Sequence, residues 1–271
     1  MENRAAESFV AVAEDGAKLR AWSYGAGSET LLLVSGLGGT GGFWKEAAPL
    51  LAAGRRVICF DQRGIGASDR GQAQVTIDLL ARDCLAVLDA AETERCLLLG
   101  HSTGGCIGQT FAATQSKRVS GLILSATWLK PSRYMTALFE SRREILDDSP
   151  LTYAATSVLF SYMPAWLEDN WQIFDTAVAN APATREAALV VRERIDALLA
   201  FDGSALAPSL DLPALVLGAR DDMIVPLFQQ QILASALPVV DMTVFEAGGH
   251  FFPVSQRAEF VAEVTKWIAS R

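Results

Sequence analysis

The chain has 271 residues, 51% of them hydrophobic, which is enough for one sizeable core. Its 23 basic and 31 acidic residues give a net charge of −8 without any basic run, which argues against nucleic acid or a membrane surface as a partner. The first sixteen residues lack the apolar core of a signal peptide, and no apolar run reaches the roughly 18 residues of a membrane span, so we expect a cytoplasmic protein. The four cysteines form no C-x-x-C pair, so we expect neither a metal ribbon nor a redox motif.

Apolar runs alternate with helical patterns over the first half of the chain. Residues 8–25 predict a hairpin that turns at Asp15-Gly16. Buried strands are expected at residues 30–34, 56–60, 95–100 and 119–126, and helices at 43–54, 76–91 and 104–116. Strands that alternate with helices predict a parallel sheet covered on both faces.

The alternation stops after Thr127. From Trp128 to about Pro208 the sequence predicts mostly helices, and we interpret this stretch as an inserted helical unit. The alternation then resumes, with strands expected at 212–219 and 240–246 and helices at 226–237 and from about 255 to 270. The sequence therefore predicts a core domain of residues 1–127 and 209–271 that is interrupted by a helical cap of residues 128–208.

A G-x-S-x-G motif, Gly100 to Gly104, stands directly between a predicted strand and a predicted helix. Such a sharp turn exposes the central serine at the carboxyl end of a strand, where open α/β sheets bind ligands. Ser102 is therefore the candidate nucleophile. The alternative is an ordinary helix N-cap serine in a glycine-rich turn.

A serine hydroxyl needs a base to take its proton, and the chain offers only two histidines. His101 neighbours Ser102, but adjacent side chains diverge on a sharp turn, so we expect it to pack or to line the site. His250 follows the last predicted strand and is the candidate base. Asp222 is the preferred carboxylate partner, with Asp221 as a turn or capping residue, because the order Ser…Asp…His is that of hydrolase triads.

A second glycine cluster raises a competing hypothesis. Gly36, Gly38 and Gly41 match the dinucleotide-binding spacing G-x-G-x-x-G, and Asp61 follows the next apolar run. Asp61 and Asp69, in "DQRGIGASD", are instead interpreted as residues that order a loop, with Arg63 as an ion-pair partner. Ser102, Asp222 and His250 favour a hydrolase over a dinucleotide-dependent oxidoreductase, and we expect no cofactor and no metal.

Five motifs together resemble the α/β-hydrolase superfamily in content and order: "VSGLGG", "FDQRGIGASD", "GHSTGG", "GARDDMIVP" and "AGGHFF". The resemblance covers nearly the whole chain. The stretches "LVSGLGGTGGFW", "CFDQRGIG", "ATWLKPSRY" and "FSYMPAWLEDN" are most similar to the aminoacrylate hydrolases of pyrimidine breakdown. The 3-oxoadipate enol-lactonases and the meta-cleavage product hydrolases are close in pattern. Many members carry His-Gly where this chain has Ser35-Gly36, which weakens the transfer of any one substrate.

The resemblance implies a mostly parallel eight-stranded sheet with helices on both faces and a helical cap over Ser102. Thr103, directly after the nucleophile, would supply one N–H of an oxyanion hole. Leu37 would supply the other by resemblance, with Gly38 as the alternative. The residues expected to line the substrate pocket are Gly36, Gly38, His101 and Trp128.

The predicted function is that of a serine hydrolase acting on a small-molecule ester, lactone, enol-lactone or amide-like substrate. The alternatives are cleavage of a C–C bond on the same fold and a ligand receptor with vestigial turnover. Five arginines of the cap, of which one could hold a substrate carboxylate, are otherwise expected on a solvated helical face: Arg133, Arg142, Arg143, Arg192 and Arg194. The sequence leaves open whether the chain forms a homodimer.

Overall fold

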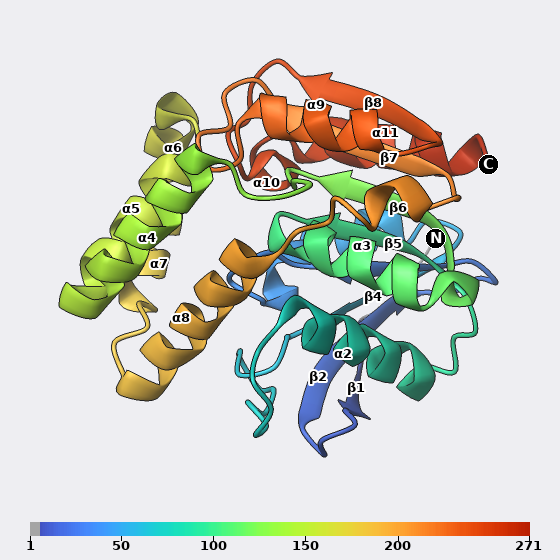
Figure 1. The fold of residues 1–271 in the computed structure, drawn as a ribbon, viewed down its shortest axis with the longest axis horizontal. Helices are drawn as coiled ribbons and strands as arrows, with labels where there is room; N and C mark the ends of the chain where they lie inside the picture. The colour runs from blue at the N-terminus through green and yellow to red at the C-terminus, as the bar shows by residue number, and fades with distance from the viewer. Residues whose placement is uncertain (1–5) are drawn as a thin grey trace.

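The computed structural model describes residues 6–271, so residues 1–5, the start of the segment in which no signal peptide is expected, lie outside the described part. The described strands form one sheet in the order β1-β2-β4-β3-β5-β6-β7-β8 (Figure 1). β1–β2 and β2–β4 are antiparallel, and every other neighbouring pair is parallel. The strands are β1 (Glu7–Val12), β2 (Lys18–Gly25), β3 (Thr30–Val34), β4 (Arg56–Phe60), β5 (Cys96–His101), β6 (Val119–Ser125), β7 (Ala214–Ala219) and β8 (Val240–Phe245).

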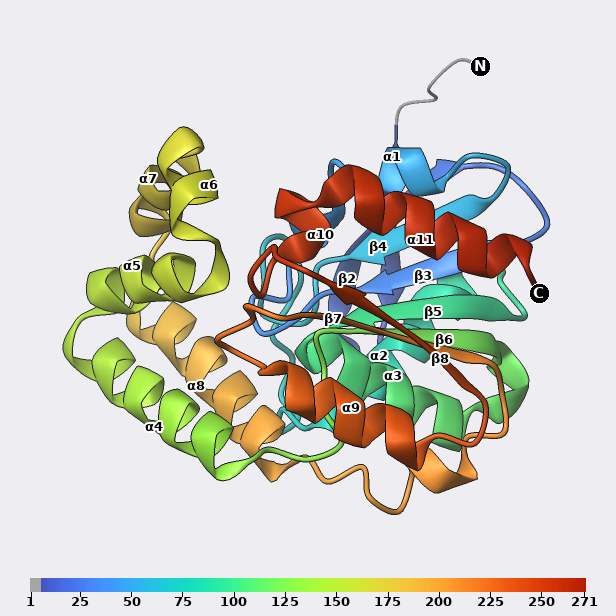
Figure 2. The ribbon, with the colours of Figure 1, turned by 90° about the horizontal axis from the view of Figure 1, so that it is seen from above.

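Helices cover both faces of this sheet (Figure 2). One face carries α2 (Ile77–Ala90), α3 (Thr103–Thr114) and α9 (Leu227–Ala236), and the other carries α1 (Ala48–Leu51), α10 (Phe252–Ser255) and α11 (Arg257–Ala269). Successive side chains of a strand point to opposite faces, so β3 contributes Leu32 and Val34 to the first core and Leu31 and Leu33 to the second. The predicted eight-stranded, mostly parallel sheet with two helical layers is confirmed.

The predicted helix over residues 43–54 is wrong in extent. The segment forms a 3₁₀ helix at Gly41–Trp44 and a four-residue α-helix, α1, that begins only at Ala48. Pro49 stands in the first turn of α1, where its missing N–H costs nothing. A helix running through from residue 43 would have placed the proline ring against the carbonyl of Lys45, which explains the interruption. Two further 3₁₀ helices cover Ser116–Arg118 and Ala207–Ser209.

Five helices between β6 and β7 stand together to one side of the sheet (Figures 1 and 2). We call them the insert helices: α4 (Arg133–Asp148), α5 (Pro150–Ser161), α6 (Pro164–Asp169), α7 (Gln172–Ala179) and α8 (Arg185–Ala200). Three of them begin with a serine or threonine whose side chain accepts a backbone N–H of the first turn, at Ser132, Ser149 and Thr184. The division into domains at residues 127/128 and 208/209 stays a prediction.

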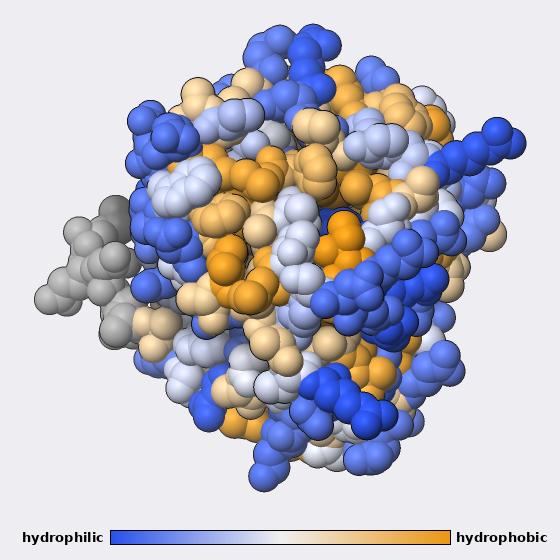
Figure 3. All heavy atoms as spheres, turned by 90° about the vertical axis from the view of Figure 1, so that its left-hand side faces the viewer, coloured by the Kyte–Doolittle hydropathy of each residue, from blue (hydrophilic) through white to orange (hydrophobic). Residues whose placement is uncertain are grey.

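The side of the molecule that carries the insert helices presents apolar side chains near its centre and hydrophilic residues around them (Figure 3). Exposed apolar side chains of the insert helices include Leu159, Phe160 and Leu189. Within residues 6–271, we find no helix that combines the length and the apolar character needed to cross a membrane.

A buried ion-pair network joins the β1–β2 hairpin to α2. The Arg63 guanidinium donates to Asp83 at 2.6 and 2.7 Å and to Asp15 at 2.9 Å, and Arg63 and Asp83 each expose 1% of their surface. The predicted partners of Arg63 are therefore corrected, because neither Asp61 nor Asp69 pairs with it. Asp61 orders the loop as expected, since its carboxylate accepts the N–H of Gly41 at 2.8 Å.

We predict that Arg63→Met lowers the free energy of unfolding by about 3–5 kcal/mol, because the Asp83 carboxylate is left buried without its cation. The double variant Arg63→Met/Asp83→Leu should recover part of this loss, since it leaves no unpaired charge at the α2 side. Urea unfolding of both variants and of Asp83→Leu measures the coupling. A double variant whose loss equals the sum of the two single losses would contradict the expectation.

Candidate active site

Ser102 occupies a strained turn between β5 and α3. Its backbone has φ 55° and ψ −124°, a conformation that L-residues rarely adopt. The Ser102 N–H donates to the Ser125 carbonyl at 2.8 Å, which fixes the turn against β6. The Ser102 side chain makes no capping bond to α3, so the N-cap alternative is not what the structure shows. Within residues 6–271 the hydroxyl makes no hydrogen bond, to His250 or to any other group.

Three glycines leave room for this turn. A β-carbon at Gly100 would lie 2.2 Å from the Gly104 carbonyl oxygen, and one at Gly104 would lie 2.2 Å from the Val34 carbonyl oxygen. A β-carbon at Gly36 would lie 2.9 Å from Cβ of Ser102 and 3.4 Å from its Oγ. Larger side chains at these positions would therefore push the turn away from β3. The short distances from Gly36 also show that the loop after β3 passes directly beside the serine hydroxyl.

Unused backbone donors flank Ser102. Thr103 opens α3, and the first N–H groups of a helix have no partner within that helix. Leu37 and Gly38 belong to the loop that Gly36 brings against Ser102. In the described part of the chain, the N–H groups of Leu37, Gly38 and Thr103 donate no hydrogen bond. These N–H groups are therefore free to donate hydrogen bonds to a negatively charged oxygen.

Asp222 and His250 are brought together from the carboxyl ends of β7 and β8. Oδ2 of Asp222 lies 2.8 Å from Nδ1 of His250, and both residues are at most 4% exposed. Oδ1 of Asp222 accepts the N–H groups of Ile224 and Val225, each at 2.8 Å, which fixes the carboxylate. A carboxylate can only accept, so Nδ1 of His250 carries the proton and Nε2 is left with a free lone pair.

Asp221 has a different structural role from Asp222. Its carboxylate accepts the N–H groups of Gly248 and Gly249 at 3.1 and 2.9 Å, and so ties the loop after β8 to the loop after β7. Both glycines have positive φ, of 144° and 65°. Asp221 thus caps the segment that carries His250, rather than a helix or a turn of its own.

His101 is buried and enclosed by aromatic rings. It stacks on Phe43 with ring centroids 5.0 Å apart, and its Nδ1 lies 3.1 Å from Oγ of Ser125. Its ring centroid is 5.0 Å from that of His250. Burial, reinforced by His250, holds the pKa of His101 well below its ordinary value, so its ring stays neutral near pH 7.

The four residues expected to line a substrate pocket differ in their access to solvent. Gly36 is half-buried beside Ser102 and Gly38 is exposed, whereas His101 exposes 1% of its surface and Trp128 none. Trp128 packs in the core that includes the α2, α3 and α9 side of the sheet, so this arrangement gives it no surface for contact with a substrate.

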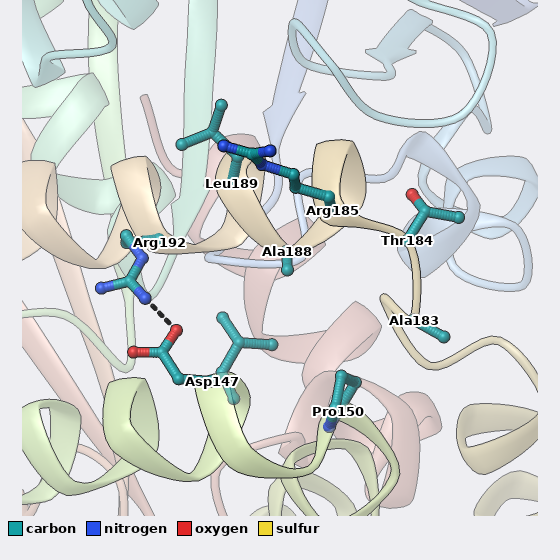
Figure 4. Close-up of a pocket in the computed structure, with 9 residues that line it drawn as sticks. Asp147, Pro150, Ala183, Thr184, Arg185, Ala188, Leu189 and Arg192 are labelled. Carbon is teal, nitrogen blue, oxygen red and sulfur yellow. Dashed lines mark hydrogen bonds and ion pairs between the residues drawn. The ribbon is translucent and has the colours of Figure 1, made fainter.

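A cavity of about 390 Å³ lies on the insert helices (Figure 4), and Ser102 is not among the residues that line it. The close-up shows an ion pair between Arg192 and Asp147 on its wall. The residues that line it come from α4, α5, α8 and the segment before α8: Leu146, Asp147, Pro150, Ala183, Thr184, Arg185, Ala188, Leu189 and Arg192. Of the residues singled out from the sequence, only Arg192, one of the five insert arginines, lines this cavity, and the predicted catalytic, oxyanion and pocket residues do not. Residues 6–271 also hold no group of three or more His, Cys, Asp or Glu side chains that could bind a metal.

Two of the insert arginines are buried, which corrects the expectation of a solvated face. Arg142 is 7% exposed and lies among Phe139, Tyr153 and Ser157. Arg194 is 1% exposed and donates to the carbonyls of Gly36 and Leu37, so it reaches the loop beside Ser102. The sequence holds a signal for this placement, because Arg194 falls four residues after Val190 and four before Leu198, on the buried stripe of α8.

Comparison with known proteins supports one family. A family model described as "alpha/beta hydrolase fold" matches residues 29–255. A protein of Variovorax paradoxus with the name "Putative carbamate hydrolase RutD" is 37% identical over 247 residues, which cover 90% of this chain and 93% of the relative. A protein of the same name from Azorhizobium caulinodans is 34% identical over 84% of this chain and 86% of its own length.

Solved structures show the same fold. The enol-lactonase of Burkholderia xenovorans LB400 superimposes with a TM-score of 0.87 over 96% of this chain and 100% of its own, at 21% identity. A hydrolase of Pseudomonas aeruginosa PA01 superimposes with a TM-score of 0.86 over 98% of this chain and 99% of its own, at 25% identity. The resemblance drawn from the sequence motifs is thereby confirmed.

We predict that His101 makes stability depend on pH. Because the pKa of His101 is lowered in the folded state, only the unfolded chain takes up its proton as the pH falls below about 6.5, and the free energy of unfolding falls with it. In His101→Asn this fall should be shallower, by up to about 1.4 kcal/mol per pH unit. Urea unfolding at pH 7.5, 6.5 and 5.5 compares the two proteins. Parallel pH profiles would show that His101 contributes nothing.

Proposed function

The chain belongs to the alpha/beta hydrolase fold family and is a hydrolase, and from this premise we propose that it uses Ser102, His250 and Asp222 as a catalytic triad. The observation that carries the proposal is the combination of a strained, unpartnered Ser102 with a histidine whose Nδ1 is held by a buried carboxylate. The serine hydroxyl is then available as a nucleophile, and Nε2 of His250 as a base. Hydrogen bonds between nucleophile and base are often long before substrate binds, so the lack of a hydrogen bond between Ser102 and His250 among the described residues does not contradict this role.

The proposed reaction has two halves. In the first, Nε2 of His250 takes the Ser102 proton while Oγ attacks the substrate carbonyl carbon, and the imidazolium then returns that proton to the leaving group. In the second, His250 takes a proton from water, the resulting hydroxide attacks the acyl-serine, and the acid product leaves. Asp222 keeps the proton on Nδ1 and stabilises the imidazolium in both halves.

Backbone N–H groups form the proposed oxyanion hole. Thr103 donates from the first turn of α3, and Leu37 donates from the loop that passes beside Ser102, with Gly38 as the alternative donor in that loop. The support is that none of the three N–H groups has a partner of its own. The negative charge on the tetrahedral intermediate would supply that partner only while the reaction proceeds.

The substrate is proposed to be a small carbamate, amide-like compound, ester or lactone. The curated relatives at 37% and 34% identity carry the name carbamate hydrolase, which favours a carbonyl carbon bonded to nitrogen. All four substrate types present a carbonyl to Ser102 and release an amine or an alcohol. The insert helices act in this proposal as a cap, because α5 and α8 meet the loops that carry His250 and Leu37.

We predict that Ser102→Ala abolishes hydrolysis of p-nitrophenyl acetate and of a small carbamate, while its thermal unfolding stays close to that of the unmodified protein. The reason is that the substitution removes the atom that forms the acyl-enzyme and no hydrogen bond that holds the fold. Release of p-nitrophenolate and of ammonia measures the two reactions. Unchanged rates in Ser102→Ala would exclude the mechanism. If the unmodified protein turned over only a meta-cleavage dienoate, the result would favour C–C bond cleavage. If it bound one of these compounds tightly without turning it over, the result would favour a ligand receptor.

We predict that the two neighbouring aspartates differ sharply in effect. Asp222→Asn should lower kcat by about 10⁴-fold, because an amide donates to Nδ1 and stabilises the wrong tautomer of His250. Asp221→Asn should lower kcat by less than about tenfold, because one oxygen remains to accept an N–H of the Gly248–Gly249 segment. Steady-state kinetics with the same ester measures both variants. Equal losses would mean that Asp222 only orders the loop, as Asp221 does.

A further inference from the structure

Arg194 reaches from the insert helices into the loop beside Ser102. Its Nε donates to the Leu37 carbonyl at 2.7 Å and its Nη2 to the Gly36 carbonyl at 3.1 Å. Nη2 also donates to Oε1 of Gln62, whose own Nε2 donates to the Ser35 carbonyl at 2.8 Å. One side chain of α8 therefore holds two successive peptide groups of the loop directly and a third, that of Ser35 and Gly36, through Gln62.

Because a peptide group is rigid, holding its carbonyl oxygen also fixes the direction in which its N–H points. A trans peptide is planar, and its C=O and N–H point in opposite directions. The Gly36 carbonyl shares a plane with the Leu37 N–H, and the Leu37 carbonyl shares a plane with the Gly38 N–H. Arg194 draws both carbonyls toward α8, so both N–H groups point away from α8. Neither of these two N–H groups has a partner among residues 6–271.

The charge of Arg194 is not balanced by the protein. Its hydrogen-bond partners are all neutral oxygens, and it takes part in no ion pair of the described residues. Its Nη1 is buried without any partner in this part of the chain. Burial lowers the pKa of Arg194 to about 10, which still leaves it protonated at neutral pH. A buried cation without a counter-ion is costly, which suggests a use for its charge.

We infer that Arg194 is a positioning residue for the proposed reaction: it aims the Leu37 and Gly38 N–H groups at the oxyanion and places a positive charge behind them. The role rests on the proposed function, because it acts on the oxyanion hole. The guanidinium donates to Gly36, Leu37 and Gln62 and makes no hydrogen bond to Ser102. It polarises the two peptide groups through their carbonyls, and so strengthens the N–H groups as donors when negative charge develops on the substrate oxygen.

In this role, the packing of α8 determines the orientation of the proposed oxyanion donors. α8 is separated from β3 by more than 150 residues of sequence, yet it fixes the loop that follows β3. Rotation of the Gly36–Leu37 peptide would turn its N–H away from the oxyanion. Arg194 and the Gly39 N–H, which also donates to the Gly36 carbonyl at 3.0 Å, both oppose this rotation.

Arg194→Met tests the inference, because it keeps much of the buried volume and removes both the hydrogen bonds and the charge. With p-nitrophenyl acetate, a neutral ester without a carboxylate, kcat should fall by about 10²-fold while KM changes by less than about threefold. Inhibition by a trifluoromethyl ketone, whose adduct with Ser102 carries an oxyanion, should weaken by a similar factor. Arg194→Lys keeps the charge and can still reach a carbonyl, so its kcat should lie between that of the unmodified enzyme and that of Arg194→Met.

Arg142→Met is the matched control, since Arg142 is also a buried arginine of the insert helices but contacts Ser157, Phe139 and Tyr153 instead of the loop. It should keep the kcat of the unmodified enzyme even if its melting temperature falls. A normal kcat in Arg194→Met, a loss confined to KM, or equal losses in the two Met variants would overturn the role of Arg194. Absence of Ser102-dependent turnover in the unmodified enzyme would instead overturn the proposed function, and this role with it.

Discussion

The strained turn at Ser102 is the constraint on which the rest of the site depends. A residue with φ 55° between a strand and a helix is stable only if its surroundings hold it there, and here the Ser125 carbonyl and the close approach of Gly100, Gly104 and Gly36 do so. The same turn leaves the first N–H of α3 and the Ser102 hydroxyl without a hydrogen-bond partner among the described residues, in a residue that is 4% exposed. The strain, one proposed oxyanion donor and the proposed nucleophile therefore arise from one backbone feature, and the loop after β3 passes beside it.

Two different supports hold the two halves of the candidate site. The Asp222–His250 pair is fixed by backbone donors to Asp222, by Asp221, which ties the two loops together, and by the Ser161 carbonyl of α5, which accepts the Phe251 N–H. The loop at Leu37 is fixed from outside the sheet, by Arg194 of α8. The proposed base and its carboxylate thus depend mostly on contacts near the strand ends, with one hydrogen bond to α5, whereas the proposed oxyanion donors of the Leu37 loop depend on Arg194 of α8.

Features that depend on neighbouring residues in the chain could be predicted from the sequence. Apolar runs of four to six residues predicted the strands, and the sequence around Ser102 predicted its place between a strand and a helix, because both depend on neighbours in the chain. The role of Ser102 as nucleophile stays a prediction. The extent of the helix over residues 43–54 was wrong because Pro49 acts on the preceding turn, an effect visible in the sequence but weighed too lightly. The burial of Arg194 and its contacts with the loop after β3 were missed for another reason. Its place on the buried stripe of α8 is readable from spacing, but its partners, Gly36 and Leu37, are more than 150 residues away.

The glycines at 36, 38 and 41 show why a fingerprint match alone misleads. A dinucleotide site needs free N–H groups at the start of a long helix, where a permanent pyrophosphate can bind. Here the third glycine opens a 3₁₀ helix of four residues, and the Asp61 carboxylate already accepts the Gly41 N–H. A protein carboxylate thus occupies the position that a phosphate would need and would repel it. The donors left free lie one turn earlier, at Leu37 and Gly38, beside a serine. Glycine-rich backbone brings N–H groups close to negative charge in both kinds of site, but the neighbours of those groups decide whether that charge is permanent or exists only during a reaction.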